Sequence, residues 1–246
     1  SATFALTDKA PMKDRMLVFA RKLLDRGHYV EFATHDETYV RRFHHEAQAA
    51  AKLVHANIVQ IHEVGCVDGV HYIVQEYVPG RNLKQLLTHR GRPFDAPQVA
   101  LVLRQVAAAL QKASDEGIIH RDIKPENIML SNSGEVKVAD FGLARIATGG
   151  DKLDLTQIGM TMGTPLYMSP EQVEGKPVDP RSDLYSLGVT AYHILAGRPP
   201  FDGDSALAVA VQHLKNEPTR LESIRPDVPS GLCRVVHRLL AKKMED

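Results

Sequence analysis

The hydrophobic pattern of this chain changes at Pro79-Gly80, and this change limits the kinds of fold that the sequence can adopt. Before it, residues 57–78 read as two strands joined at Asp68-Gly69, a strong hairpin signal, and residues 16–24 form another strand-like run. After it the pattern is mostly helical, and one stretch places apolar residues at helix spacing: Val99, Val102, Leu103, Val106, Leu110 and Ala113. We therefore predict an α+β fold in which a small β-rich part precedes a larger helical one.

The length of 246 residues fits one large domain or two small lobes. We place a small lobe, with one main helix beside its strands, at residues 1–78 and a larger, mainly helical lobe at residues 79–246. A hairpin is predicted inside the helical lobe, because the strand-like segments 128–130 and 136–138 flank a turn-rich cluster. Later helices are predicted over 183–195, 205–214 and 232–242.

The charges of the chain balance, since 30 basic and 30 acidic residues give a formal net charge of zero. Without a block of like charges, nucleic acid and anionic membrane surfaces are unfavourable partners. The two cysteines, Cys66 and Cys233, argue against a disulfide scaffold, and no apolar run is long enough to span a bilayer. We expect a cytoplasmic protein. Because the chain does not begin with Met, the alternative is the intracellular part of a larger membrane-anchored protein.

A polar segment, His120–Asn127, lies between a helix that ends near Gly117 and a predicted strand, which places it in a loop. Transfer of a phosphoryl group to a hydroxyl needs a carboxylate to orient and deprotonate the nucleophile, a cation at the migrating phosphate, and oxygen ligands for magnesium. Asp122, Lys124 and Asn127 supply that set. The predicted hairpin would fold Asp140 back beside Asn127, which gives magnesium a carboxylate and an amide oxygen.

The same segments resemble the signatures H-R-D-L-x-x-x-N and D-F-G of the protein kinase family, with Ile123 in the Leu position. Ser169-Pro170-Glu171 stands where the family has A-P-E, and Asp183 stands where it has the Asp that braces the catalytic loop. The stretch MGTPLYMSPEQ looks most like bacterial-type Ser/Thr kinases. The resemblance covers essentially the whole chain and implies the two-lobed kinase fold, with ATP between the lobes. It also implies that His120 packs against Phe141 in a structural role.

In the small lobe, the resemblance points to a phosphate clamp. The run around Lys22 resembles the family's V-A-I-K strand, and strand alternation places Ala20 and Lys22 on one face. The resemblance implies that this face contacts the nucleotide. Glu46 lies on the apolar stripe of a predicted helix, where a buried carboxylate requires a partner, and Lys22 is the expected one. That stripe consists of Phe43, Ala47, Ala50 and Val54. A surface Glu on an ordinary amphipathic helix is the alternative.

The stretch YIVQEYVPG resembles the family's hinge between the lobes. The resemblance implies that the backbones of Glu76 and Val78 bond adenine and that Gln75 guards the deeper pocket. Lys124, two residues after the base, is what Ser/Thr kinases carry. The resemblance further implies that Thr164 bonds Asp122 and Lys124 and closes a substrate pocket sized for Ser or Thr.

Regulation by phosphorylation is expected in the long polar segment between the D-F-G and S-P-E motifs. Thr156 and Thr161 are the candidate sites, and Arg121 beside the base could pair with a phosphate there. For both threonines the alternative is an ordinary exposed loop residue.

The sequence departs from the family pattern at both ends. Ser1–Phe4 aligns with only the last residues of the family's glycine-rich loop, so this polypeptide is expected to bind ATP more weakly than an intact kinase. The chain also stops just before the family Arg that pairs with the Glu of A-P-E, here Glu171. We accordingly expect a kinase domain truncated at both ends and of reduced activity.

The function that follows is an ATP-dependent protein Ser/Thr kinase that uses Mg²⁺, with Mn²⁺ as an alternative. Its partners would be proteins bearing Ser or Thr, and self-association would permit autophosphorylation. Two alternatives stay open. One is an interaction scaffold with this fold and no turnover, and the other is a small-molecule phosphotransferase, which would not be expected to carry the GTPLY and S-P-E features.

Overall fold

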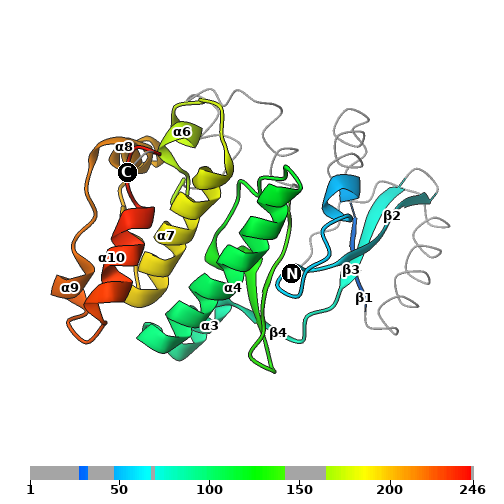
Figure 1. Ribbon diagram of the computed structural model, residues 1–246, viewed down its shortest axis with the longest axis horizontal. Helices are drawn as coiled ribbons and strands as arrows, with labels where there is room; N and C mark the ends of the chain where they lie inside the picture. Colours follow the sequence, from blue (N-terminus) through cyan, green and yellow to red (C-terminus); the bar gives the residue numbers. More distant parts are fainter. Residues whose placement is uncertain (1–27, 33–46, 68–69, 142–164, 245–246) are drawn as a thin grey trace.

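The computed structural model describes four stretches of the chain, residues 28–32, 47–67, 70–141 and 165–244. They form two parts that lie side by side in Figure 1, a small sheet from the first third of the chain and a larger part built mostly of helices. The predicted α+β architecture, with a small β-rich lobe before a larger helical lobe, is confirmed.

The first sheet has three antiparallel strands in the order β1-β3-β2. Strands β2 (Ile61–Val67) and β3 (Val70–Glu76) are the two predicted strands, paired with Val67 opposite Val70 across the Asp68-Gly69 turn signal. Strand β1 (His28–Phe32) is an addition to the prediction and pairs with β3. The strand-like run predicted at residues 16–24 lies outside the described residues.

Part of the predicted helix before this hairpin is present, since residues 47–50 are helical. Ala47 and Ala50 are buried as expected. The assignment of Val54 to the same buried stripe is wrong, because its exposed fraction is 72%. The helix ends before residue 51, so the helical spacing no longer applies, and Leu53 enters the core in its place.

The second sheet lies in the helical part and has the order β4-β5-β6, again antiparallel. Its strands are β4 (Gly80–Asn82), β5 (Ile128–Ser131) and β6 (Val136–Val138), and the last two are the predicted hairpin. A Cβ on Gly80 would clash with the carbonyl oxygen of Leu130, so this crossing of backbones requires glycine. Asn82 then caps helix α3 (Leu83–Arg90) in a capping box with Gln85.

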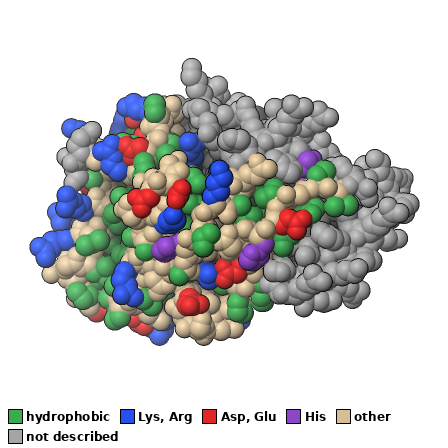
Figure 2. All heavy atoms as spheres, turned by 45° about the vertical axis from the view of Figure 1, so that its right-hand side comes forward, with side chains coloured by type: hydrophobic (Ala, Val, Ile, Leu, Met, Phe, Trp, Pro, Cys, Tyr) green, Lys and Arg blue, Asp and Glu red, His purple; other side chains and the backbone are tan. Residues whose placement is uncertain are grey.

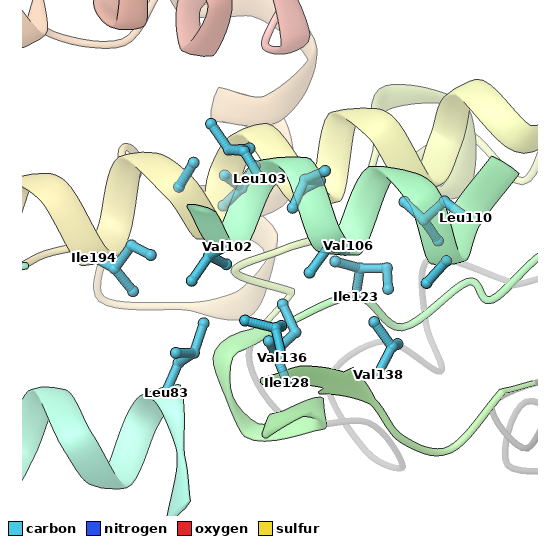
Figure 3. Packing of buried hydrophobic residues seen from close by; sticks show 14 of the residues in the cluster. Leu83, Val102, Leu103, Val106, Leu110, Ile123, Ile128, Val136, Val138 and Ile194 are labelled. Atoms are coloured by element: carbon cyan, nitrogen blue, oxygen red, sulfur yellow. The ribbon is translucent and has the colours of Figure 1, made fainter. Parts of the chain in front are cut away.

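Helix α4 (Ala96–Asp115) carries the predicted apolar stripe, and all six of its residues are buried. The stripe packs over the β5–β6 hairpin. Figure 3 shows Val102, Val106 and Leu110 of α4 facing Ile128, Val136, Val138 and Ile123. Burial of a side chain of this size contributes about 1.5–3 kcal/mol. The core therefore lies directly beneath the loop that contains Ile123.

Helix α7 (Pro180–Ala196) packs against both α4 and α10 (Ser230–Leu239). It is buried on nearly every side, and at Gly188 a Cβ would lie 2.7 Å from Cβ of Leu239. The predicted helices at 183–195 and 205–214 correspond to α7 and α8 (Ala206–Lys215). The third one, predicted to end at residue 242, ends at Leu239. Two short helices complete this part: α6 (Pro170–Val173) precedes α7, and α9 (Leu221–Ile224) lies between α8 and α10 in the chain.

The two sheets are joined through the segment that precedes β2. Ile58 forms a parallel bridge with Val138 of β6, and the Nδ2 group of Asn57 donates to the carbonyl oxygen of Val136 at 2.8 Å. The chain itself crosses between the sheets at residues 77–79. Beside that crossing, Nζ of Lys137 lies 2.9 Å from the carboxylate of Glu76. The two parts are therefore attached at two separate places.

Within the stretches that the structure describes, no helix is both long enough and apolar enough to span a membrane. Among the described side chains on the face that Figure 2 shows, acidic and basic groups are interspersed and do not gather into a patch of one sign. This arrangement agrees with the zero net charge of the sequence.

Candidate active site

The polar loop 120–127 is held from below by the hydrophobic core. Ile123 is fully buried against α4 and the β5–β6 hairpin, as Figure 3 shows, and a turn of 3-10 helix over Pro125–Asn127 leads into β5. Arg121 has φ 69°, a left-handed conformation that is uncommon for a residue with a side chain. Such a conformation persists only where surrounding contacts impose it.

Asp183 of α7 supplies those contacts. Its two carboxylate oxygens accept the backbone N–H groups of His120 and Arg121, each at 2.7 Å. The exposed fraction of Asp183 is 3%, and burial raises the pKa of its carboxyl, although the neighbouring His120 and the two N–H donors oppose that shift. The brace that the sequence resemblance implies for Asp183 is therefore present.

Asp122, Lys124 and Asn127 converge in this loop as the sequence predicts. Oδ2 of Asp122 lies 2.6 Å from Nζ of Lys124 and accepts Nδ2 of Asn127 at 3.0 Å. A second bond joins Nδ2 of Asn127 to the carbonyl oxygen of Asp122 at 2.9 Å. The Asp122 carboxylate is thus fixed by a cation and an amide, while about a third of the side chain, 34%, remains exposed to an incoming group.

Asp140 reaches the same place from the other side of the hairpin. The N–H of Ala139 donates to the carbonyl oxygen of Asn127 at 2.9 Å, so the residue after β6 and the residue before β5 are neighbours. Asp140 has φ 61°, and burial raises the pKa of its carboxyl, with a further contribution from the Asp122 charge. A divalent cation would offset both effects.

The residues present fit magnesium. The amide nitrogen of Asn127 is engaged with Asp122, which turns its amide oxygen away from that carboxylate. That oxygen and the carboxylate of Asp140 are hard ligands, and magnesium at phosphate sites commonly takes only one or two protein ligands. On this chemistry, Asn127 and Asp140 could hold the ion together with phosphate oxygens.

The packing of His120 against Phe141 that the resemblance implies is confirmed. Its ring lies edge-on to the ring of Phe141 with centroids 4.6 Å apart, and its Nε2 lies 2.8 Å from the carbonyl oxygen of Ala139. Both ring contacts tie the loop to the segment that carries Asp140. His120 is fully buried and is therefore not placed to exchange protons with a substrate.

The predicted hinge residues lie at the end of β3, where Gln75 and Val78 are buried. The backbone N–H of Glu76 donates to the carbonyl oxygen of Gln60 at 2.8 Å, so it is not available to a ligand. Any backbone bond from Glu76 to adenine would use its carbonyl group. The nucleotide roles of Glu76 and Val78 stay predictions.

Several predicted site residues lie outside the described residues. These are Ala20, Lys22 and Glu46 of the expected phosphate clamp, the regulatory candidates Thr156 and Thr161, and the pocket residue Thr164.

The structure also adds contacts that the sequence analysis missed. Nε2 of Gln172 donates to the carbonyl oxygen of Arg121 at 2.9 Å, which ties α6 to the catalytic loop. The hydroxyl of Ser182 donates to the buried carboxylate of Glu171, so this Glu has a partner within the described chain. The S-x-x-Q spacing from Ser169 to Gln172 is a capping-box signal that predicts the start of α6, but it does not indicate the contact with Arg121.

The comparisons with known proteins all match protein kinases. A family model described as "Protein kinase domain" matches residues 3–246. The "Probable serine/threonine-protein kinase PknB" of Corynebacterium glutamicum is 46% identical over 219 residues, which cover 86% of this chain and 34% of that protein. The "Serine/threonine-protein kinase PrkC" of Bacillus subtilis is 39% identical over 207 residues, or 84% of this chain and 31% of that protein. The chain thus spans about a third of the length of these relatives.

Among solved structures, the crystal structure of the PknI kinase domain of Mycobacterium tuberculosis superposes with a TM-score of 0.67 at 30% sequence identity. The match covers 89% of this chain and 78% of that chain. The similarity therefore extends through both parts of the fold.

Proposed function

The chain belongs to the protein kinase family, and from that premise we propose that it transfers the γ-phosphate of ATP to serine and threonine hydroxyls of proteins. The observation that carries the proposal is the fixed carboxylate of Asp122, held at Oδ2 by Lys124 and Asn127. A hydroxyl that approaches the other oxygen, Oδ1, would be oriented for in-line attack and could give up its proton there.

Lys124 has a second role in this proposal. Its ammonium group lies 2.6 Å from the base, so it neutralises the carboxylate and places positive charge beside the hydroxyl that attacks. Because the charge of the transferred phosphoryl group is spread over its oxygens in the transition state, a fixed cation there lowers the barrier without reorganisation. The loop therefore contributes mainly position and charge.

Asn127 and Asp140 would hold Mg²⁺, with Mn²⁺ as an alternative, and the ion would neutralise the ATP phosphates when bound. Ala20 and the backbones of Glu76 and Val78 would contact the nucleotide, and Lys22 with Glu46 would clamp its phosphates. Support for these assignments comes from the motif positions and, for the metal site, from the half-buried carboxyl of Asp140, whose pKa is raised chiefly by burial.

Control of this activity is proposed to act through Thr156 and Thr161, with Thr164 lining the pocket for the acceptor hydroxyl. Phosphorylation there adds charge that Arg121 could pair with. The partners would be Ser- or Thr-containing proteins, and pairing of two chains would allow autophosphorylation. We place the domain in the cytoplasm, where ATP is available and cysteines such as the exposed Cys66 stay reduced, with attachment to a membrane anchor as the alternative.

The test is magnesium-dependent transfer of labelled γ-phosphate from ATP to a generic basic protein and to the chain itself, followed by mapping of the labelled residues. Asp122→Asn removes the base, and Asp115→Asn is the matched control. Asp115 is exposed at the end of α4, where its carboxylate accepts a bond from Nε2 of Gln111. We expect label on Ser or Thr for the unaltered chain and for the control variant, and none for Asp122→Asn.

Two results would reject the proposal. Binding of ATP in a thermal-shift assay without transfer of label would favour an interaction scaffold that has no turnover. Label on a free aminoglycoside or on choline, with none on protein, would favour a small-molecule phosphotransferase. Label at Thr156 or Thr161 would support control through those residues.

A further inference from the structure

The side chain of Lys242, just beyond the end of α10, lies against a cluster of aromatic rings. Its Nζ atom lies 4.3 Å from the ring centroid of Phe201 and 5.5 Å from that of Tyr185 of α7. His213 of α8 completes the cluster, because its ring centroid lies 4.8 Å from that of Phe201 and 5.7 Å from that of Tyr185. The three rings are buried, whereas Lys242 is half-buried. The end of this lysine side chain therefore has an apolar environment, in a residue that solvent still reaches.

The ionic environment of Lys242 differs from that of four other lysines. In those four, Nζ lies 2.6–2.9 Å from a carboxylate oxygen: Lys112, Lys124, Lys137 and Lys176. Within the described part of the chain, no carboxylate lies within 4.0 Å of Nζ of Lys242. Its hydrogen-bond partner is instead the hydroxyl oxygen of Tyr185, which accepts from Nζ at 3.2 Å. The ammonium form of Lys242 is therefore stabilised less than it would be in an ion pair.

The direction of the hydrogen bonds in the cluster follows from the state of His213. Burial lowers the pKa of His213 to about 3, with a further contribution from the charge of Lys242, so the ring is neutral. Its Nδ1 lies 3.0 Å from the hydroxyl of Tyr185 and accepts the proton of that hydroxyl. The tyrosine oxygen is left with lone pairs only toward Lys242. One neutral acceptor thus serves the amine.

These surroundings favour the free amine. Burial lowers the pKa of Lys242 to about 8, and the exposed Glu217, which follows α8, is the charge that opposes this shift. Neutral His213 and protonated Tyr185 add no charge. At about pH 7 a pKa of about 8 leaves about 9% of the amine free, against about 0.04% for an ordinary lysine. The free amine is the form of lysine that attacks a carbonyl carbon.

We propose that Lys242 is an acylation site, whose amine takes a small acyl group such as acetyl from an activated donor, an acyl phosphate or an acyl thioester. The lone pair of Nζ forms a bond to the carbonyl carbon of the donor. The bond from that carbon to the phosphate oxygen or to the sulfur breaks, and phosphate or thiolate leaves with the electron pair. One proton passes from the nitrogen to water. The product is a neutral amide, which costs less to hold among aromatic rings than the ammonium group that it replaces.

The test measures acetylation of each lysine in the folded chain by mass spectrometry after cleavage at acidic residues. Acetyl phosphate is the donor in one arm and acetyl-CoA in the other. Lys243 is the internal control, because it is the next residue and is exposed. Tyr185→Phe removes the acceptor and keeps the ring. Tyr192→Phe is the matched control, since it removes another tyrosine hydroxyl of α7, the one that donates to the carbonyl oxygen of Thr219.

At about pH 7 we expect Lys242 to be acetylated at least about ten-fold faster than Lys243 with one or both donors. This ratio is smaller than that of the free amines because a less basic amine attacks more slowly and the site is half enclosed. The rate at Lys242 should level off above about pH 8, whereas the rate at Lys243 should continue to rise. Tyr185→Phe should raise the rate at Lys242 by up to about ten-fold, the limit at which all of the amine is free, and Tyr192→Phe should leave it unchanged.

Three outcomes would overturn the inference. Equal rates at Lys242 and Lys243 with both donors would show that the cluster does not set this amine apart. A ratio that persists in concentrated urea would trace the difference to local sequence and not to the fold. A rate at Lys242 that rises in parallel with that at Lys243 above about pH 8 would show that its amine titrates as an ordinary lysine does. None of these readouts requires phosphate transfer, so they are independent of the proposed kinase activity.

Discussion

Replacement of Asp183 by Asn tests whether the catalytic loop depends on its brace. Asp183 is buried, and its carboxylate accepts two backbone N–H groups, from His120 and Arg121, at 2.7 Å each. An Asn side chain has nearly the same shape but only one acceptor oxygen, so its amide N–H₂ would face one of the two donors. The variant therefore loses one hydrogen bond to a charged group and leaves a buried N–H without an acceptor.

The expected loss follows from those two changes. A hydrogen bond to a charged group contributes about 1.5–3 kcal/mol, and an unsatisfied buried donor costs about 1–3 kcal/mol. The two figures are not added in full, because both describe the loss of the acceptor from the same N–H group. We expect the free energy of unfolding to fall by about 3 kcal/mol. For a chain of this size, that corresponds to a decrease in Tm of roughly 6–12 °C.

The effect on activity should exceed the effect on stability. Arg121 has φ 69°, and without both N–H bonds its backbone is free to relax toward a more common conformation. Asp122 is the next residue and would move with it. Because a misplacement of about 1 Å can lower a rate about a hundred-fold, we expect phosphate transfer to fall by about that factor at a temperature where the variant is folded.

Urea unfolding and the transfer assay measure these two effects. The control is Asp179→Asn, the same substitution four residues earlier, at the N-cap of α7. Asn caps a helix about as well as Asp, and the ion pair with Arg181 is partly exposed to solvent, so this variant should lose less than about 1 kcal/mol. Equal losses in the two variants, or full activity of Asp183→Asn, would refute the reasoning.

Two further predictions concern stability. Burial lowers the pKa of His213 to about 3, so between that pH and about 6.5 the unfolded chain binds a proton that the folded chain does not, and stability falls as the pH falls. Between about pH 7 and about pH 5 the free energy of unfolding should fall by about 2 kcal/mol for this reason. Urea unfolding should show this decrease in the unaltered chain relative to His213→Phe. An equal pH dependence in both would contradict the prediction. Gly188→Ala should destabilise the fold by about 1–3 kcal/mol, because the added Cβ would meet Leu239. Gly231→Ala on α10 adds a Cβ in open space and should stabilise the fold by up to about 0.5 kcal/mol. Thermal unfolding of both variants checks the two signs.

Local patterns predict most of the secondary structure, and the errors have local causes. The Asp68-Gly69 signal and the stripe of α4 are strong because each combines turn or cap residues with several apolar positions in register. The predicted end of α10 is three residues too late because no glycine follows Leu239, so the sequence contains no stop signal there. Spacing alone assigns Val54 to the core, although the helix has already ended.

The candidate site is predictable to the extent that it lies within one loop. Asp122, Lys124 and Asn127 are close in sequence, so their contact needs no knowledge of the tertiary fold. Asp183 is 63 positions from His120 and 62 from Arg121 in the sequence, so local spacing does not reveal that it braces them. Only the family resemblance indicates this contact. The bond from Gln172 to the carbonyl oxygen of Arg121 depends on how α6 packs on the loop, and the sequence pattern does not indicate it.

The two attachments between the sheets have a mechanical consequence. Residues 57–58 are bonded to β6, and the chain crosses again at residues 77–79. Two fixed points define a line, so the rigid-body motion of one part against the other that keeps both attachments intact is a rotation about that line. Rotation about that line would change the separation of the two parts while the ion pair of Lys137 and Glu76 stays close to the axis.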